Sequence, residues 1–339
     1  MIKILNPFLL LISALLFNSC NPSKDPTLVK FNGQIQGTYY AVTYYDKDGR
    51  NLQIEIDSLL KEFDHTASMW VDNSIISKIN RNDPTVEINQ DFIRLFDLSN
   101  EVYQRSMGAF DPTIGPLVNA WGFGFADRMK VDQHVIDSLL PLVDFAKVRL
   151  EGNIISKADE RIQFDFNAIA QGYSVDLLGA FLEENRITNY LLDIGGEVLA
   201  KGKKPRGESW RVGIEKPLDN ATYGEGLKAI VKLNDKALAT SGNYRKFYEE
   251  EGVRYSHTID PKTGYPVQHT LLSVSVLAGD CASADAYATV FMVMGLEKSK
   301  AFLNDSQNME AYFIYSDELG NLRTYFTQGF KEIIIEEME

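Results

Sequence analysis

The chain has few cysteines and histidines and no excess of positive charge. Its 339 residues include two cysteines and four histidines, and 47 acidic residues against 34 basic ones give a formal net charge of −13. This balance argues against a nucleic-acid-binding surface and against electrostatic docking on anionic lipid. An anionic small ligand would therefore need local help, from a metal ion or from helix N-termini.

An apolar run long enough to span a membrane is missing at the N-terminus. Lys3 precedes an apolar stretch, residues 8–17, whose length suits a signal-peptide core of about 7–15 residues rather than a spanning helix of about 20. The stretch ends in Phe17-Asn18-Ser19-Cys20, which resembles the lipobox where bacterial lipoproteins are cleaved and acylated. We interpret residues 1–19 as a lipoprotein signal peptide and 20–27 as lipidated Cys20 with a short tether. An ordinary secretory signal with an incidental cysteine is the alternative.

If the sulfur of Cys20 carries the lipid, Cys281 is the only free thiol that remains. The mature chain then cannot form an internal disulfide, even in an oxidising compartment, so its fold must rest on its core. A hydrophobic fraction of 45% and a charged fraction of 24% are ordinary for a globular protein. No low-complexity linker divides the remainder, and we expect a single domain over residues 28–335. Cys281 is expected to be a small buried residue without chemistry.

The pattern of apolar residues predicts an α/β (α+β) chain with many antiparallel-compatible links. No Walker loop is present, and Gly122-Phe123-Gly124 lacks the third glycine and the preceding strand of a dinucleotide-binding fingerprint. Helices are expected over residues 53–63, 90–107, 174–185 and 284–294, the last with Ser283 as N-cap and closed by Gly295. Strands are expected over residues 31–45 (as a pair or one long strand), 161–166, 189–200, 210–216, 229–233, 237–240 and 271–277, with a final hairpin over 309–326.

Residues 108–124 are too rich in glycine and too unperiodic for an ordinary helix or strand. Glycines let a backbone approach a ligand, Phe110 and Trp121 offer flat faces for a ring system, and Asp111 can accept hydrogen bonds from a heterocycle. We interpret this run as a ligand-wrapping loop. A buried turn with aromatic packing is the alternative that its composition leaves open.

A possible metal site lies in the helix expected after Ser283. Asp285 and Thr289 are four residues apart, so their carboxylate and hydroxyl lie on one helix face. Such hard oxygen ligands suit Mg²⁺ or Ca²⁺, which leave coordination positions for substrate phosphates. We expect a pyrophosphate to bind there, with its charge met by the metal and by the positive end of the helix. An ordinary helix-start carboxylate and a packed threonine are the alternative.

His257 stands at the end of an expected strand, directly before a turn with two prolines and a glycine within residues 255–266. It can act as a base or bind a ligand phosphate or ring. A purely structural histidine is the alternative.

These segments together resemble the ApbE family of FAD:protein FMN transferases, Mg²⁺-dependent flavin-attaching enzymes that are usually exported as lipoproteins. The resemblance spans most of the mature chain. It implies an ApbE-like (T-fold-like) fold of mixed, largely antiparallel sheets with packed helices and a FAD site in a cleft between subregions. The segments that carry it are Gly37-Thr38-Tyr39-Tyr40, Ser68-Met69-Trp70 with residues 74–80, and residues 108–124, 165–176, 240–244, 257–266 and 284–289.

The resemblance also assigns roles to individual residues. It implies metal binding by the side chains of Asp285 and Thr289 and by the backbone carbonyl of Ser174, which requires an open or irregular helix start there. His257 and Asp285 are the implied catalytic residues. Residues that would contact FAD are Gln36, Trp70, Ala109, Phe110, Asp111, Gln171, His257 and Ile259, with the flavin or its ribityl chain at 109–111.

Two of these positions depart from the family pattern. Gln36 stands where a methionine often precedes Gly-Thr, and Gln171 stands where lysine or glutamate is common. Gln171 can hydrogen-bond FAD but contributes no charge, so the affinity for FAD is the property that this departure would change.

The implied reaction is attack by a threonine, occasionally serine, hydroxyl of an acceptor protein on the FMN-side phosphorus of FAD, with release of AMP. Mg²⁺, with Ca²⁺ or Mn²⁺ as alternatives, would polarise the pyrophosphate, and His257 would take the proton. The implied acceptors are flavin-bearing subunits of membrane electron-transfer complexes with a short Ser/Thr motif. The implied location is the periplasmic side of a membrane, and the inner membrane is favoured over the outer one. The lipid would be the only contact with that membrane.

Two other functions are compatible with the same residues. A periplasmic FAD pyrophosphatase would use water in place of the acceptor hydroxyl and yield FMN and AMP. A non-catalytic, membrane-tethered FAD-binding lipoprotein would store or deliver flavin, although mere binding would not require Asp285, Thr289 and His257.

Overall fold

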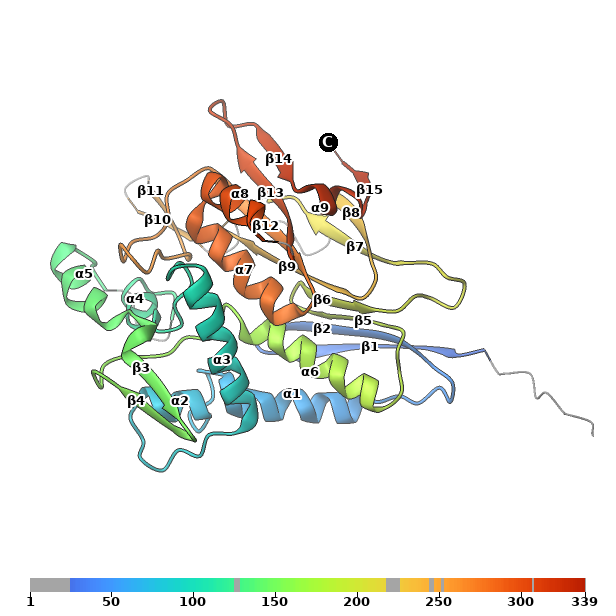
Figure 1. Cartoon of the computed structure of the whole chain (residues 1–339), viewed down its shortest axis with the longest axis horizontal. Coiled ribbons are helices and arrows are strands. Elements are labelled where there is room, and N and C mark those ends of the chain that lie inside the picture. Colours follow the sequence, from blue (N-terminus) through green and yellow to red (C-terminus); the bar gives the residue numbers. More distant parts are fainter. Residues whose placement is uncertain are drawn as a thin grey trace, which may run out of the picture.

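The fold is built around an eight-stranded sheet in which every neighbouring pair of strands is antiparallel. The computed structural model (Figure 1) describes residues 25–124, 129–217, 226–243, 247–250, 253–306 and 308–338, so the segment interpreted as a signal peptide and Cys20 lie outside the described residues. In spatial order, the strands are β1 (Thr27–Ile35), β2 (Thr38–Asp46), β5 (Tyr190–Ile194), β6 (Glu197–Lys201), β9 (Lys236–Gly242), β12 (Leu271–Ala278), β13 (Glu310–Ser316) and β14 (Leu322–Phe326).

A smaller sheet packs against the central one. It has the order β15-β8-β7, formed by β7 (Trp210–Glu215), β8 (Leu227–Leu233) and β15 (Ile334–Glu337). Trp210 and Ile214 of this sheet share a buried apolar cluster with Val198, Leu238 and Tyr312 of the central sheet. Two hairpins complete the described strands, β3 (Val148–Glu151) with β4 (Ile154–Lys157) and β10 (Phe247–Glu250) with β11 (Val253–Ser256).

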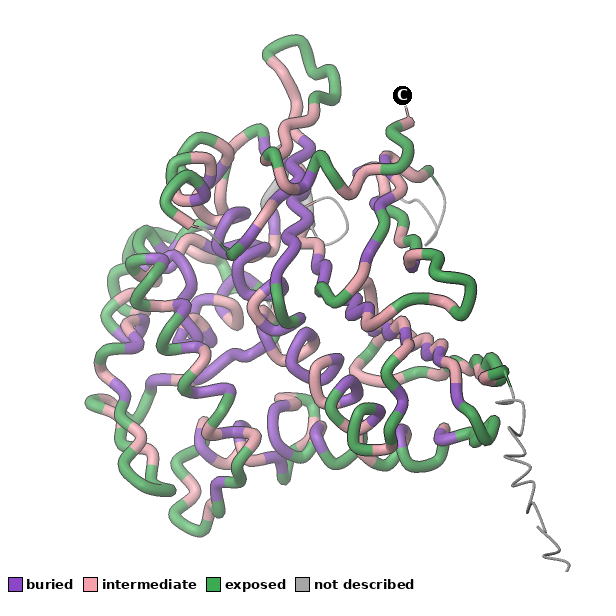
Figure 2. The backbone as a smooth tube through the Cα atoms, turned by 45° about the vertical axis from the view of Figure 1, so that its right-hand side comes forward, coloured by how far each residue is buried: buried purple, intermediate pink, exposed green. Residues whose placement is uncertain are grey.

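Helices cover the other part of the core. α6 (Ala170–Glu184) packs against α7 (Cys281–Met294), and both contact the central sheet. α7 is apolar on nearly all sides, as expected of a helix enclosed by neighbours. Figure 2 shows buried residues along the central strands and these helices and exposed ones mainly in the peripheral loops. The remaining helices are α1 (Gln53–Ala67), α2 (Ile75–Asn80), α3 (Gln90–Arg105), α4 (Gly115–Ala120), α5 (Gln133–Leu139), α8 (Leu296–Asn304), α9 (Gln328–Lys331) and the 3-10 turns η1 (Leu140–Leu142) and η2 (Phe145–Lys147).

Most elements expected from periodicity are confirmed. The strand pair at β1 and β2, the helices α1 and α3, and the final hairpin of β13 and β14 lie where the pattern predicts them. Gly295 ends α7 with a φ of +73°, a conformation that glycine adopts without strain. Among the described residues, no helix has the length and apolar character needed to cross a bilayer.

Three expectations about local structure are wrong. Residues 161–166 form no strand, because only an isolated bridge joins Gln163 to Ile114. Residues 189–200 are two strands rather than one, since Gly195 and Gly196 turn the chain with φ of +66° and +111°. The loop over 108–124 contains the short helix α4, whose Pro116 suits a helix start.

Both central helices also begin earlier than their periodicity indicates. α6 starts at Ala170 rather than near residue 174. α7 starts at Cys281 with Asp280 as its N-cap, and Ser283 donates its backbone N–H to the Asp280 side chain at 2.8 Å. Aspartate and serine are equally good N-caps, and the small residues between Asp280 and Ser283 give no periodicity that would mark the earlier start.

Candidate active site

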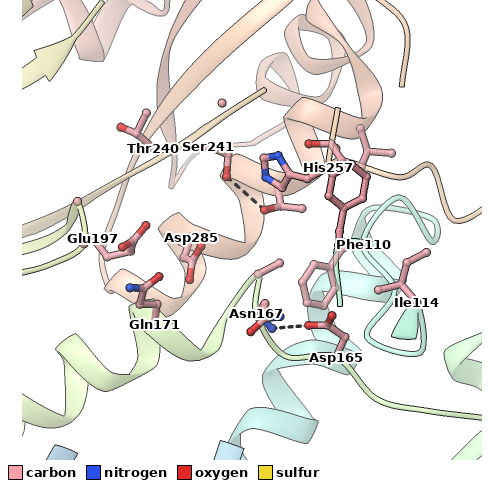
Figure 3. A pocket seen from close by; sticks show the side chains of 18 of the residues that line it. Phe110, Ile114, Asp165, Asn167, Gln171, Glu197, Thr240, Ser241, His257 and Asp285 are labelled. Atoms are coloured by element: carbon pink, nitrogen blue, oxygen red, sulfur yellow. Dashed lines mark hydrogen bonds between the residues drawn. The ribbon is translucent and has the colours of Figure 1, made fainter. Parts of the chain in front are cut away.

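Except for Ser174, the residues expected to bind FAD and metal line one cavity of about 490 Å³. α7, the start of α6, the strand β9, the β5–β6 turn and the loops at residues 109–123 and 257–261 all contribute to its wall. Figure 3 shows Asp285, Gln171 and Glu197 on one side of it and Phe110 and Ile114 on another. Of the predicted site residues, the cavity is lined by Gln36, Trp70, Ala109, Phe110, Asp111, Gln171, His257, Ile259, Asp285 and Thr289.

The crossing of α6 over α7 positions Asp285. At Gly172 the two helices are so close that a β-carbon would collide with the Cys281 carbonyl oxygen and lie 2.8 Å from Asp285 Cβ. The Gly172 N–H donates to Asp285 Oδ2 at 3.0 Å, which fixes the carboxylate from a neighbouring helix. This contact was not predicted, and only the glycine in Ala170-Gln171-Gly172 marks it in the sequence.

The first residues of α7, 281–284, do not line the cavity, which contradicts the expectation that this helix end meets a pyrophosphate there. The Asp176 carboxylate of α6 accepts the N–H groups of Cys281 and Ala282, both at 2.8 Å. The Asp280 side chain and carbonyl accept those of Ser283 and Ala284. The N–H groups of Cys281, Ala282 and Ser283, which the helix itself leaves unpaired, are therefore bound within the protein, and that of Ala284 makes the first bond of the helix. Burial raises the pKa of Asp176 to about 7, against the lowering effect of these two hydrogen bonds.

Asp285 and Thr289 lie in successive turns of α7 and both line the cavity, as their spacing predicts. Asp285 is only 6% exposed, and its burial raises the pKa of the carboxyl group to about 7. A hydrogen bond of 3.2 Å joins the hydroxyls of Thr289 and Ser241.

This donor set suits a hard divalent cation. The carboxylate is ionised only at a cost when buried, and a cation beside it would remove that cost. The described residues contain no cluster of three or more His, Cys, Asp or Glu side chains that could hold a metal. A cation at Asp285 would therefore depend on hydroxyl, carbonyl, water and substrate oxygens for its other ligands, which Mg²⁺ accepts readily.

Ser174 is not part of the cavity wall. It is the fifth residue of a continuous α6, so its carbonyl belongs to the helix ladder and the irregular helix start required of a metal ligand is absent at this position. Its buried hydroxyl lies 2.7 Å from the Gln171 carbonyl and 3.2 Å from Gln36 Oε1. Ser174 therefore supports two cavity residues from behind.

Asp111 organises its own loop. Its Oδ1 accepts the backbone N–H of Thr113 at 2.8 Å and the Thr113 hydroxyl at 2.6 Å, and its Oδ2 accepts the Phe145 N–H at 3.1 Å. Burial raises the pKa of Asp111 to about 6, and the hydrogen bonds from Thr113 and Phe145 oppose that rise. Asp111 therefore holds the backbone beside Phe110 in place as well as lining the cavity.

The aromatic loop and the His257 loop are joined to each other. Trp121 donates its indole N–H to the Gly264 carbonyl at 2.8 Å, and it packs with Ile259 rather than lining the cavity. The expectation that Trp121 presents a flat face to a ligand is therefore wrong. Phe123 does line the cavity, edge-on to the His257 ring with 6.3 Å between ring centroids. His257 is thus placed by residues that follow Asp111 in the same loop.

The two glutamine departures lie at constrained positions, Gln36 through its backbone and Gln171 through close packing. Gln36 has a φ of +52° and is followed by Gly37 at +73° in the β1–β2 turn. Gln171 packs against Gly195, where a β-carbon would lie 2.6 Å from the Nε2 atom of Gln171.

Trp70 is 70% exposed at the cavity rim. Sequence patterns gave no signal for Glu197, which is 8% exposed and lies near Asp285 and Gln171 (Figure 3).

Comparisons with known proteins all point to one family. The ApbE family profile matches residues 36–313. FAD:protein FMN transferases from Vibrio cholerae and Haemophilus influenzae are 34% and 33% identical, covering 96% and 98% of this chain and 97% and 98% of their own. The solved flavin transferase ApbE from Vibrio cholerae is 32% identical with a TM-score of 0.80, over 91% of this chain and 99% of that one. A flavinyl transferase ApbE from Pseudomonas stutzeri is 31% identical with a TM-score of 0.80, over 93% and 99%.

Proposed function

Because this chain belongs to the ApbE family, we propose that it is an enzyme that transfers FMN from FAD to a hydroxyl group of an acceptor protein and releases AMP. The observation that carries the proposal is the cavity of about 490 Å³, which gathers Asp285, Thr289 and His257 with the loop at residues 109–111. A carboxylate, a hydroxyl and an imidazole around one space suit metal-assisted phosphoryl transfer.

Asp285 and Thr289 would hold the metal, with Mg²⁺ favoured over Ca²⁺ or Mn²⁺. A bound Mg²⁺ supplies charge for the pyrophosphate and for the leaving AMP. Gly172 keeps one Asp285 oxygen in place, while Ser241 holds the Thr289 hydroxyl. The chain's contribution is therefore a fixed pair of oxygen donors in successive helical turns.

His257 would take the proton from the acceptor hydroxyl. The hydroxyl oxygen forms a bond to the FMN-side phosphorus, the bond from that phosphorus to the AMP oxygen breaks, and the proton passes to the imidazole. General-base help of this kind contributes about 10²- to 10⁴-fold. Ala109 and Phe110 would lie against the flavin part of the substrate, where their loop closes the cavity.

We also propose export and lipid anchoring at Cys20, facing the periplasm. The support is the N-terminal apolar stretch and the lipobox-like Phe17-Asn18-Ser19-Cys20. The lipid would be the only membrane contact, and the acceptor would be a flavin-carrying protein with a threonine or serine at its modification site. The net charge of −13 argues against nucleic acid as a partner.

The test uses the full chain in detergent with FAD, Mg²⁺ and the protein that the Vibrio cholerae relative modifies. A gain of one FMN in the acceptor's intact mass, matched by AMP and lost on chelation, is expected. Asp285→Asn should abolish both signals, and His257→Gln should slow them while FAD binding persists. Asp97→Asn and His134→Gln, on exposed helix positions away from the cavity, serve as matched controls. AMP release with an unmodified acceptor would instead support the pyrophosphatase.

A further inference from the structure

The hydroxyl group of Ser241 connects the metal-binding pair to the wall that β9 forms. The backbone of Ser241 pairs with Val274 of β12, and α7 packs against β9. Ser241 and Thr289 both line the cavity, and their hydroxyl oxygens are 3.2 Å apart. Figure 3 shows the Ser241 side chain directed to the part of the cavity that Asp285 and His257 border. A strand and a helix of the core therefore hold this pair of hydroxyls at the cavity wall.

The hydrogen bond between these two hydroxyls can run in either direction. Each hydroxyl has one proton to donate and two lone pairs that accept. Among the described residues, the hydroxyls of Ser241 and Thr289 have only each other as hydrogen-bond partners. The protein by itself therefore leaves open which of the two is the donor.

Metal binding by Thr289 would fix this direction. A hydroxyl oxygen binds a cation through a lone pair, so the Thr289 proton would have to point away from the cation. Ser241 Oγ is the acceptor that lies within hydrogen-bond distance of it. Ser241 would then accept from Thr289, and its own proton would be left for a third group. Because Ser241 lines the cavity, that group belongs to a molecule bound in the cavity.

The composition of the cavity wall makes such a donor useful to a phosphate group. Among the described residues that line the cavity, none is lysine or arginine and five are aspartate or glutamate. In this part of the wall, phosphate oxygens therefore depend largely on neutral donors in addition to a cation. Thr240, the neighbouring residue of β9, has its hydroxyl bound to that of the buried Ser275 at 2.7 Å. Ser241 is the β9 residue whose hydroxyl is joined to the metal-binding pair.

We infer that Ser241 is a further substrate-binding residue, which donates its hydroxyl proton in a hydrogen bond to a phosphate oxygen of FAD beside the metal-binding pair. This inference rests on the proposed function. The proton stays on Ser241, so the contact makes and breaks no covalent bond. A donor fixed on a strand needs no reorganisation when charge builds on the phosphate oxygens. Ser241 thus accepts from Thr289 and donates to the substrate.

Flavin binding without an acceptor protein tests this contact. The full chain in detergent with Mg²⁺ is titrated with FAD and with riboflavin, which has the same ring system and ribityl chain but no phosphate. Ser241→Ala should weaken the binding of FAD about tenfold or more, as expected for a lost hydrogen bond to a charged group. The Kd of riboflavin should stay within about twofold of the wild type, because riboflavin offers no phosphate oxygen. Ser241→Thr keeps a hydroxyl and should restore most of the affinity for FAD.

Two further variants separate direct contact from positioning. Ser275→Ala is the matched control, because it removes the hydroxyl that bonds Thr240 but does not itself line the cavity. It should leave both Kd values within about twofold of the wild type. Thr289→Val removes the partner of Ser241. In this background Ser241→Ala should still weaken FAD binding by about threefold or more, since the bond to the phosphate does not pass through Thr289.

Three outcomes would overturn the inference. The first is an unchanged Kd of FAD in Ser241→Ala. Equal weakening of FAD and riboflavin would show that Ser241 shapes the flavin site instead. No further loss in the Thr289→Val background would show that Ser241 acts only through Thr289.

Mass analysis of the wild-type reaction with an acceptor tests the proposed function separately. AMP with no FMN attached to the acceptor refutes the transferase, while the titrations still decide whether Ser241 binds the phosphate. FMN attached to the acceptor, together with any of the three outcomes above, refutes the Ser241 contact alone.

Discussion

Gly172→Ala is expected to disable the metal-binding pair of Asp285 and Thr289 although neither of these residues is replaced. A β-carbon at this position would collide with the Cys281 carbonyl oxygen, 2.7 Å from its carbonyl carbon and 2.8 Å from Asp285 Cβ. Two of these atoms belong to the α7 backbone, so no rotamer change can relieve the collision. The two helices must separate, and the Gly172 N–H then loses its bond to Asp285 Oδ2.

The magnitude follows from three effects. Overpacking a close helix contact costs about 1–3 kcal/mol, and losing a hydrogen bond to a charged group costs about 1.5–3 kcal/mol. Alanine recovers about 1 kcal/mol through its higher helix propensity. The free energy of unfolding should therefore fall by about 1.5–5 kcal/mol, and the affinity for Mg²⁺ should fall with it because Asp285 is no longer held.

Gly179→Ala is the matched control in the same helix. A β-carbon there would lie 2.8 Å from Leu199 Cδ2 and 2.9 Å from Tyr190 Oη, which are side-chain atoms that can move. Urea unfolding and Mg²⁺ titration of AMP release should place Gly172→Ala well below Gly179→Ala in both stability and Mg²⁺ affinity. Equal stability and an unchanged Mg²⁺ midpoint would show that the α6–α7 contact does not position Asp285.

Three further expectations concern stability. Burial raises the pKa of Asp111 to about 6 from an unfolded value near 3.9. The protonated carboxyl group therefore stabilises the fold fully below about pH 4, and the free energy of unfolding falls by about 3 kcal/mol as pH rises through 6. Asp111→Asn should flatten the pH dependence of the stability measured in urea between pH 4 and 7.5, and an unaltered slope would contradict this. Lys157 donates to the carbonyls of Ile79, Glu160 and Ile162, so Lys157→Met should lower stability by about 1–3 kcal/mol with an unchanged FAD Kd, whereas a weaker Kd would refute a structural role. Trp121→Phe removes the bond to Gly264 and should cost about 1–3 kcal/mol while raising the KM for FAD, and no change in either would show that this contact does not hold the His257 loop.

Local patterns in the sequence predicted much of this protein. Helical spacing located α1 and α3, and the four-residue interval of Asp285 and Thr289 placed both on the cavity side of α7. Gly295 marked the end of that helix. These predictions succeed because periodicity, caps and turns depend on neighbours within a few residues along the chain.

Long-range packing decided the rest. Asp285 is held by Gly172, 113 residues away, and the start of α7 is capped by Asp176, 105 and 106 residues away. Trp121 does not line the cavity, because its indole N–H donates to the carbonyl of Gly264, 143 residues further along the chain. Composition and local spacing determine which elements form, whereas contacts between distant segments decide which side chains and strand edges meet, since no local signal encodes the partner.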